Sequence, residues 1–101
     1  MEIERVNTIL RVKNIRDGVI GFEIELPDAP PLILIRGRKG FIMCGYINLD
    51  VAEKLGLVVV RVSGVSSIEE MLEKEVSEAT SRAKEIGIKA GVKVKDIIDL
   101  I

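Results

Sequence analysis

Two runs of alternating apolar and polar residues on either side of Asp17-Gly18 constrain the fold of this chain more than any other feature. Residues 6–13 and 19–26 both follow the period of two that is typical of strands, and an Asp-Gly pair between such runs favours a tight turn. The pattern therefore predicts an antiparallel β-hairpin with one buried face. Three prolines between residues 27 and 31 then end the second strand.

Two continuous apolar runs follow the hairpin, at residues 32–35 and 41–44, and a third run at residues 57–62 is nearly all valine. Continuous rather than alternating runs are typical of strands that are covered on both faces. The first two runs are joined by a basic segment at residues 36–40, which we interpret as a solvated hairpin tip. The last two enclose a short helical stretch, so we expect a right-handed strand–helix–strand crossover.

Capping residues mark the helices in the second half of the chain. Asn48 precedes a short stretch with helical periodicity, which Gly56 ends, so the pattern predicts a helix through Leu55. Ser67, with Glu70 three residues later, forms a capping box that predicts the start of the next helix.

One apolar stripe continues from this capping box to residue 86, so residues 67–86 form either one helix or two. We favour a break near Glu75, with Ser77 as the cap of the second helix. A last helix is predicted at the end of the chain because its apolar residues follow helical spacing. These residues are Val94, Ile97, Ile98 and Ile101.

Together these elements predict an α+β protein with a single domain over residues 1–101. The sheet is mixed and has about five strands, with an antiparallel N-terminal meander and helices mainly on one face. Short helices do not suffice to cover both faces of such a sheet, and residues 97–101 form an apolar tail. We therefore expect a homo-oligomer, in which a second copy covers the remaining apolar surface.

The segment 40–46, Gly-Phe-Ile-Met-Cys-Gly-Tyr, resembles the signature of the YunC-like family, small bacterial and archaeal domains of unknown function. The similarity continues through residues 62–65, Val-Ser-Gly-Val, into the capped helix, and then to residues 85–91. It covers about the C-terminal two-thirds of the chain. The resemblance implies a compact α/β domain and no particular activity.

The composition excludes several classes of function. Acidic and basic residues nearly cancel, 16 against 15, so we expect neither a nucleic-acid partner nor an anionic membrane surface. The chain has no histidine and one cysteine, which excludes a Ser-His-Asp or Cys-His arrangement and a closed zinc site within one chain. We expect no metal and no cofactor. The use of Ile, Val, Glu and Lys without glutamine resembles that of hyperthermophile proteins.

The start of the chain lacks the apolar stretch of a signal peptide, and its longest apolar run is too short to span a bilayer. A single cysteine forms no disulfide within the chain, which suits a reducing compartment. We therefore expect a cytoplasmic protein.

Two segments are candidates for a site. Cys44 is the one residue with distinctive chemistry, and Gly45 beside it lets a ligand come close to the backbone. Ser63, Gly64, Ser66 and Ser67 link a strand to a helix start, where hydroxyl groups and backbone N–H groups favour a small anionic ligand. Both segments also have an interpretation without a function: Cys44 is a buried core thiol, and the serines are ordinary helix caps.

Two hypotheses of function remain open. In the first, the chain is a non-catalytic, self-associating module that binds a small ligand or a partner protein. In the second, it is a thiol-dependent enzyme or redox sensor built around Cys44. We favour the first because residue types that carry catalysis are scarce. A buried and unreactive Cys44 is expected from its apolar neighbours.

Overall fold

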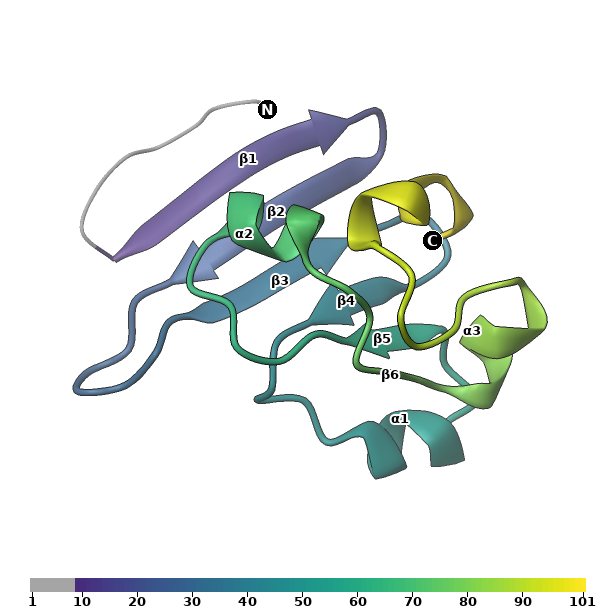
Figure 1. Ribbon diagram of the computed structural model, residues 1–101. Coiled ribbons are helices and arrows are strands. Elements are labelled where there is room, and N and C mark those ends of the chain that lie inside the picture. Colours follow the sequence, from purple (N-terminus) through teal and green to yellow (C-terminus); the bar gives the residue numbers. More distant parts are fainter. Residues whose placement is uncertain (1–8) are drawn as a thin grey trace.

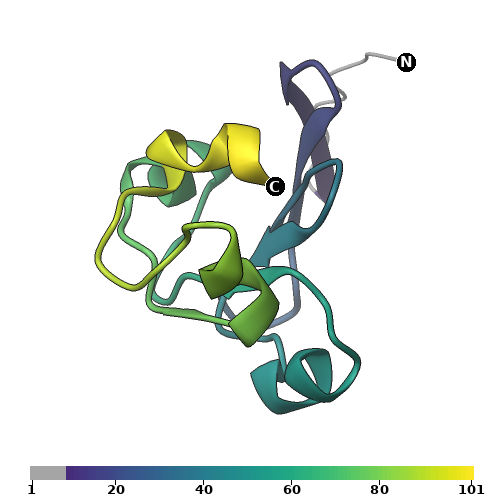
Figure 2. The same cartoon turned by 90° about the vertical axis from the view of Figure 1, so that its right-hand side faces the viewer.

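The computed structural model describes residues 9–101, which form one mixed sheet with helices packed mainly on one face (Figures 1 and 2). The six strands lie side by side in the order in which they occur in the chain. They are β1 (Leu10–Arg16), β2 (Val19–Ile24), β3 (Leu32–Arg36), β4 (Phe41–Met43), β5 (Val59–Arg61) and β6 (Glu78–Ala79). All neighbours are antiparallel except β4 and β5, which are parallel. The predicted α+β class and N-terminal meander are confirmed.

The first hairpin has the predicted turn. Arg16 pairs with Val19 across Asp17-Gly18, and Gly18 has a φ of 78°, a conformation that glycine adopts without a steric penalty. The first strand runs from Leu10 to Arg16, later than predicted, and predicted residues 6–8 lie outside the described residues.

A parallel crossover follows the meander. Its helix α1 (Leu49–Lys54) is capped by Asn48, whose side chain accepts hydrogen bonds from the backbone of Asp50 and Val51, as predicted. The two strands pack so closely that a Cβ atom on Gly40 would overlap the carbonyl oxygen of Val58. The first glycine of the family signature is thus explained by the approach of two backbones.

Residues 67–86 form two short helices with a strand between them. The capping box is present at α2 (Ile68–Glu73), where Ser67 accepts from the backbone of Glu70. The predicted break is confirmed, but the second cap is wrong: α3 (Ser81–Glu85) is capped by Thr80. Ser77 instead accepts a hydrogen bond from the backbone N–H of Ser63 at 3.0 Å.

The C-terminal apolar stripe is buried but is not an α-helix. It forms two 3-10 turns, η1 (Val94–Asp96) and η2 (Ile98–Leu100), whose hydrogen bonds run from Ile97 to Val94 and from Leu100 to Ile97, and no side chain caps the start of η1. Ile97, Ile98 and Ile101 are all buried in the core of their own chain. The expectation that this tail needs a second copy for cover is therefore wrong.

The two faces of the sheet differ in their cover. On one face, under α2, α3 and the C-terminal turns, Ile33, Ile35, Ile42 and Val60 are fully buried (Figure 2). On the other face of β1–β4, eight apolar side chains are only half-buried. We call this set the open face: Val12, Ile20, Phe22, Ile24, Leu32, Leu34, Phe41 and Met43.

The hairpin turns the side with Val12, Ile20, Phe22 and Ile24 toward the open face, and its other side, where Val19 is fully buried, lies on the helix-covered face. Cross-strand pairing places Val12 opposite Phe22, and Phe22 opposite Leu34, on the open face. The covered side of the hairpin carries Arg11 and Glu23, which contact the start of α2. The side of the hairpin with Val12 and Phe22 is therefore not used by the core beneath the helices.

Candidate functional site

A pocket of about 320 Å³ lies where three loops meet, after β2, after β4 and after β5. It brings together three residues of the two predicted segments, Cys44, Gly45 and Gly64, although these segments are distant in sequence. Its lining carries no charged side chain. The lining residues are Pro30, Pro31, Cys44, Gly45, Tyr46, Gly64 and Val65.

Cys44 belongs to the pocket lining and is also a buried member of the core. It is 4% exposed, its N–H donates to the carbonyl oxygen of Ile33 at 3.1 Å, and its Sγ accepts from the N–H of Ile33 at 3.3 Å. The predicted burial of Cys44 is thus confirmed. The basic turn at residues 36–40 precedes β4 whereas Cys44 follows it, so its cations and Cys44 lie at opposite ends of the strand.

Tyr46 is a part of the site that sequence reasoning missed. The residue is 48% exposed, and its hydroxyl donates to the carbonyl oxygen of Pro30 at 2.7 Å, which joins the β4–α1 loop to the β2–β3 loop. An exposed aromatic ring fixed at its polar end is a common wall of a binding pocket. The contact spans 16 residues of chain, so no local motif announces it.

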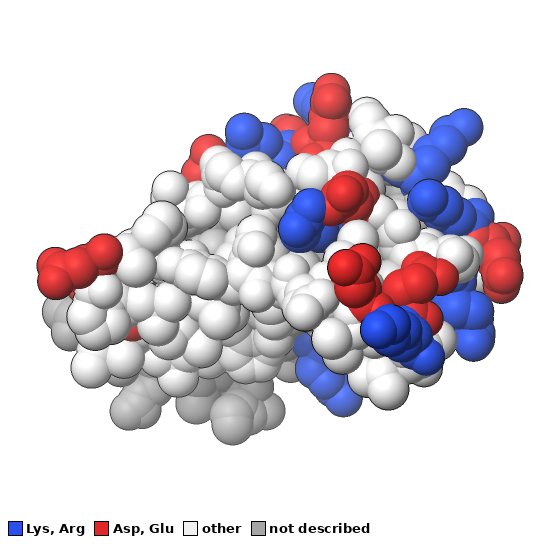
Figure 3. All heavy atoms as spheres, turned by 90° about the horizontal axis from the view of Figure 1, so that it is seen from below, with Lys and Arg blue, Asp and Glu red and all other residues white. Residues whose placement is uncertain are grey.

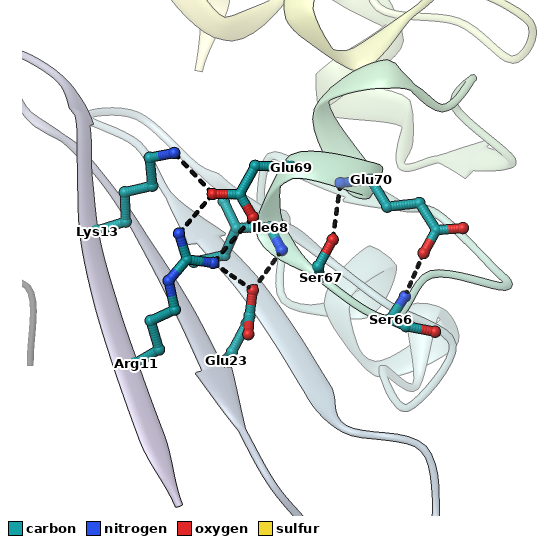
Figure 4. Close-up of polar contacts among 8 residues, drawn as sticks. All are labelled: Arg11, Lys13, Glu23, Ser66, Ser67, Ile68, Glu69 and Glu70. Carbon is teal, nitrogen blue, oxygen red and sulfur yellow. Dashed lines mark hydrogen bonds and ion pairs between the residues drawn. The ribbon is translucent and has the colours of Figure 1, made fainter. Parts of the chain in front are cut away.

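The predicted serines do not line the pocket, and two of them, Ser66 and Ser67, bind residues at the start of α2. Ser67 accepts from the backbone of Glu70 at 3.0 Å, and the Glu70 carboxylate accepts from the backbone of Ser66 at 2.8 Å (Figure 4). The backbone N–H of Ser63 donates to the hydroxyl oxygen of Ser77. The capping interpretation of these serines is the one that the geometry supports.

The chain's own carboxylates occupy the start of α2. Glu23 Oε1 accepts from the N–H of Ile68 at 2.7 Å and from Arg11 at 2.8 Å, and Arg11 and Lys13 also bind Glu69 (Figure 4). Hydrogen bonds from Arg11 and then Lys13 hold the pKa of the Glu69 carboxyl well below its ordinary value. With carboxylates already at this end of a six-residue helix, the geometry disfavours an added anion there.

Within residues 9–101 there is neither a cluster of potential metal ligands nor a membrane-spanning helix. Among these residues, no group of three or more Cys, Asp or Glu side chains could hold a metal ion. No helix within the same range is long and apolar enough to cross a bilayer.

Fold and site together define a small α+β domain with an uncharged pocket at the loop end of its sheet. The family model described as "Domain of unknown function (DUF1805)" matches residues 43–101, more than half of the chain. The chain belongs to this family, and the resemblance to YunC is confirmed.

Two proteins are similar to the chain over most of its length, one in sequence and one in sequence and structure. The chain is 38% identical to "Uncharacterized protein YunC" of Bacillus subtilis (strain 168) over 79 residues. The aligned residues cover 74% of this chain and 77% of that protein. The chain also matches the crystal structure of a protein of unknown function from Thermoplasma acidophilum, with a TM-score of 0.84 and 35% identity. That match covers 91% of this chain and 92% of the other. Neither name assigns an activity.

Proposed function

We propose that the protein is a non-catalytic cytoplasmic module that self-associates through the open face of its sheet and binds a small ligand. The open face is the observation that carries self-association. An antiparallel sheet with one solvated face usually alternates apolar and polar residues, yet β3 has Leu32 and Leu34 facing outward beside the buried Ile33 and Ile35. Apolar side chains on both faces require cover on both.

A second copy is the occupant that this face fits best. Four strands spaced by about 4.8 Å, each with about five residues rising about 3.3 Å, give roughly 300 Å² of flat sheet. Projecting side chains make the accessible area larger than that of a flat sheet, so that two such faces approach the total of about 1,000 Å² that a specific interface needs. Two copies related by a twofold axis present the same apolar strips to each other, in the packing of a β-sandwich.

The surroundings of Cys44 support a non-catalytic role. A nucleophilic thiol needs access and a nearby base or cation, and this thiol is buried between the pocket and Ile33. No charged residue lines the pocket beside it. A free cysteine is also compatible with the reducing cytoplasm in which we place the protein.

Light scattering after size exclusion tests self-association, with Leu34→Glu on the open face and Leu55→Glu as the matched control. Leu55 is 66% exposed beyond α1, so both variants add the same charge and only one adds it to the open face. We expect the wild type and Leu55→Glu to have at least twice the chain mass of 11.1 kDa, and Leu34→Glu to fall to that mass.

A wild type that stays at 11.1 kDa on concentration would contradict the proposal. Residues of the same chain would then have to cover the open face. In that event Leu34→Glu would lower stability toward urea without changing the mass, and the control would do neither.

A further inference from the structure

Gly45 is the one glycine of the chain for which the fold gives no reason. Of the nine glycines, five have a positive φ, where other residues are strained. Three more, Gly21, Gly37 and Gly40, lie so close to neighbouring atoms that a Cβ would collide with them. Gly45 has neither property: its φ is not positive, and a Cβ would meet nothing within 4 Å.

A glycine that the fold does not need weakens the folded state, because glycine loses more backbone entropy on folding than any other residue. Gly45 lines the pocket, and so does Gly64. The absence of a side chain at Gly45 therefore keeps space open at the pocket wall. This is the property expected where a ligand approaches the backbone closely.

The pocket has apolar walls and an uncharged lining, and Gly45 and Gly64 both belong to that lining. Two prolines, the Tyr46 ring and Val65 provide the apolar walls. The backbone N–H groups of Gly45 and Gly64 have no partner within residues 9–101 and remain available as donors. In Figure 3 the left half of the molecule, where Figure 1 places the β2–β3 and β5–α2 loops, is largely uncharged apart from its acidic tip.

We infer that this pocket binds a small, neutral, mostly apolar molecule that carries a hydrogen-bond acceptor such as a carbonyl group. The inference names the ligand class for the ligand binding proposed above and rests on that proposal. A volume of about 320 Å³ is at the lower end for ligand sites, so the molecule is a small one. An anion is disfavoured, because no cation lines the pocket and the Glu70 carboxylate lies beside Ser66, next to Val65.

Acetophenone and benzoate are a matched pair of probes, since they share a phenyl ring and a carbonyl carbon and differ in charge. Each is titrated into the ¹⁵N-labelled full chain while the amide resonances of Gly45, Gly64 and Val65 are followed. We expect saturable shifts of these resonances with acetophenone, and at least about tenfold weaker binding of benzoate.

Gly45→Val fills the space at the wall, and Ala90→Val is the control, because it places the same side chain at an exposed position outside the lining. We expect acetophenone to bind Ala90→Val as it binds wild type and to bind Gly45→Val at least about tenfold more weakly. Tyr46→Ala, which removes a wall by truncation, should also weaken binding. Dispersed spectra show that each variant is folded.

Three results would overturn the inference: acetophenone shifts none of the three resonances, benzoate binds as tightly as acetophenone, or Gly45→Val binds acetophenone as tightly as wild type does. The pocket and the open face share no residue, so a failure of the ligand proposal does not imply a failure of the self-association proposal, or the reverse. The Leu34→Glu variant should still bind acetophenone as a monomer. Loss of acetophenone binding in a wild type that still self-associates would leave the open-face proposal standing.

Discussion

Glu23 attaches the start of α2 to the sheet, and its replacement tests how this end of the helix is held. Its Oε1 accepts from the N–H of Ile68 at 2.7 Å and from Arg11 at 2.8 Å, and the side chains of Glu23 and Arg11 are 20% and 26% exposed. An anion at a helix start stabilises the helix through unpaired N–H groups and the helix dipole.

The size of the effect follows from these two contacts. A hydrogen bond to a charged group contributes about 1.5–3 kcal/mol, and a partly exposed ion pair contributes up to about 1 kcal/mol. Because both contacts use one oxygen, they are not additive, and we expect Glu23→Ala to lower the free energy of unfolding by roughly 2 kcal/mol. Glu23→Gln keeps an acceptor oxygen without the charge, so roughly 1 kcal/mol is expected.

Urea unfolding at pH 7, followed by circular dichroism, measures both variants at one protein concentration, since self-association makes stability depend on concentration. Glu25→Ala is the control, because Glu25 is an exposed glutamate two residues further on. A Glu23→Ala midpoint equal to that of Glu25→Ala would contradict a stabilising role of Glu23. The start of α2 would then not depend on this carboxylate.

Three further predictions concern single residues. Hydrogen bonds from Arg11 and Lys13 lower the pKa of Glu69, so its charge stabilises the fold above the ordinary glutamate pKa. This contribution is lost as the pH falls, and the difference between wild type and Glu69→Gln in urea should shrink from about pH 5 to about pH 2. Glu69 is 47% exposed, so the difference at neutral pH stays within about 1 kcal/mol. Cys44 should react with iodoacetamide far more slowly in the folded protein than in urea, and equal rates would contradict its burial. Thr80, 1% exposed, makes three hydrogen bonds through its hydroxyl, so Thr80→Val should cost roughly 2 kcal/mol in urea unfolding; an unchanged midpoint would show that the bonds contribute nothing.

Local signals in the sequence were sufficient for the elements that depend on neighbours in the chain. The Asp17-Gly18 turn, the Asn48 cap and the Ser67 capping box each involve residues a few positions apart, so their patterns predict them correctly. The two-residue strand β6 exists only through its pairing with β5, and no pattern of its own marks it. The prediction of a last α-helix is wrong. The spacing of apolar residues shows which residues are buried, and it does not show whether an α-helix or a 3-10 helix buries them.

The candidate site was predictable in part for the same reason. Cys44 and Gly45 stand out by residue type, and the structure places them in one pocket with Gly64. Tyr46 and Pro30 enter the site through a contact between distant loops. The serines lie outside the lining of this pocket, and Glu23, from another strand, reaches the helix start beside them, a contact that no local pattern shows.

The central claim is that a second copy covers the open face, and isotope-filtered NOE spectroscopy tests it most directly. Equal amounts of ¹³C-labelled and unlabelled protein are mixed, unfolded and refolded together, so that contacts between copies are seen apart from contacts within one. We expect intermolecular NOEs to the methyl groups of Val12, Ile24 and Leu34, and none to those of the buried Ile33 and Ile35. Intermolecular NOEs confined to other surfaces, or none at all at millimolar concentration, would contradict it.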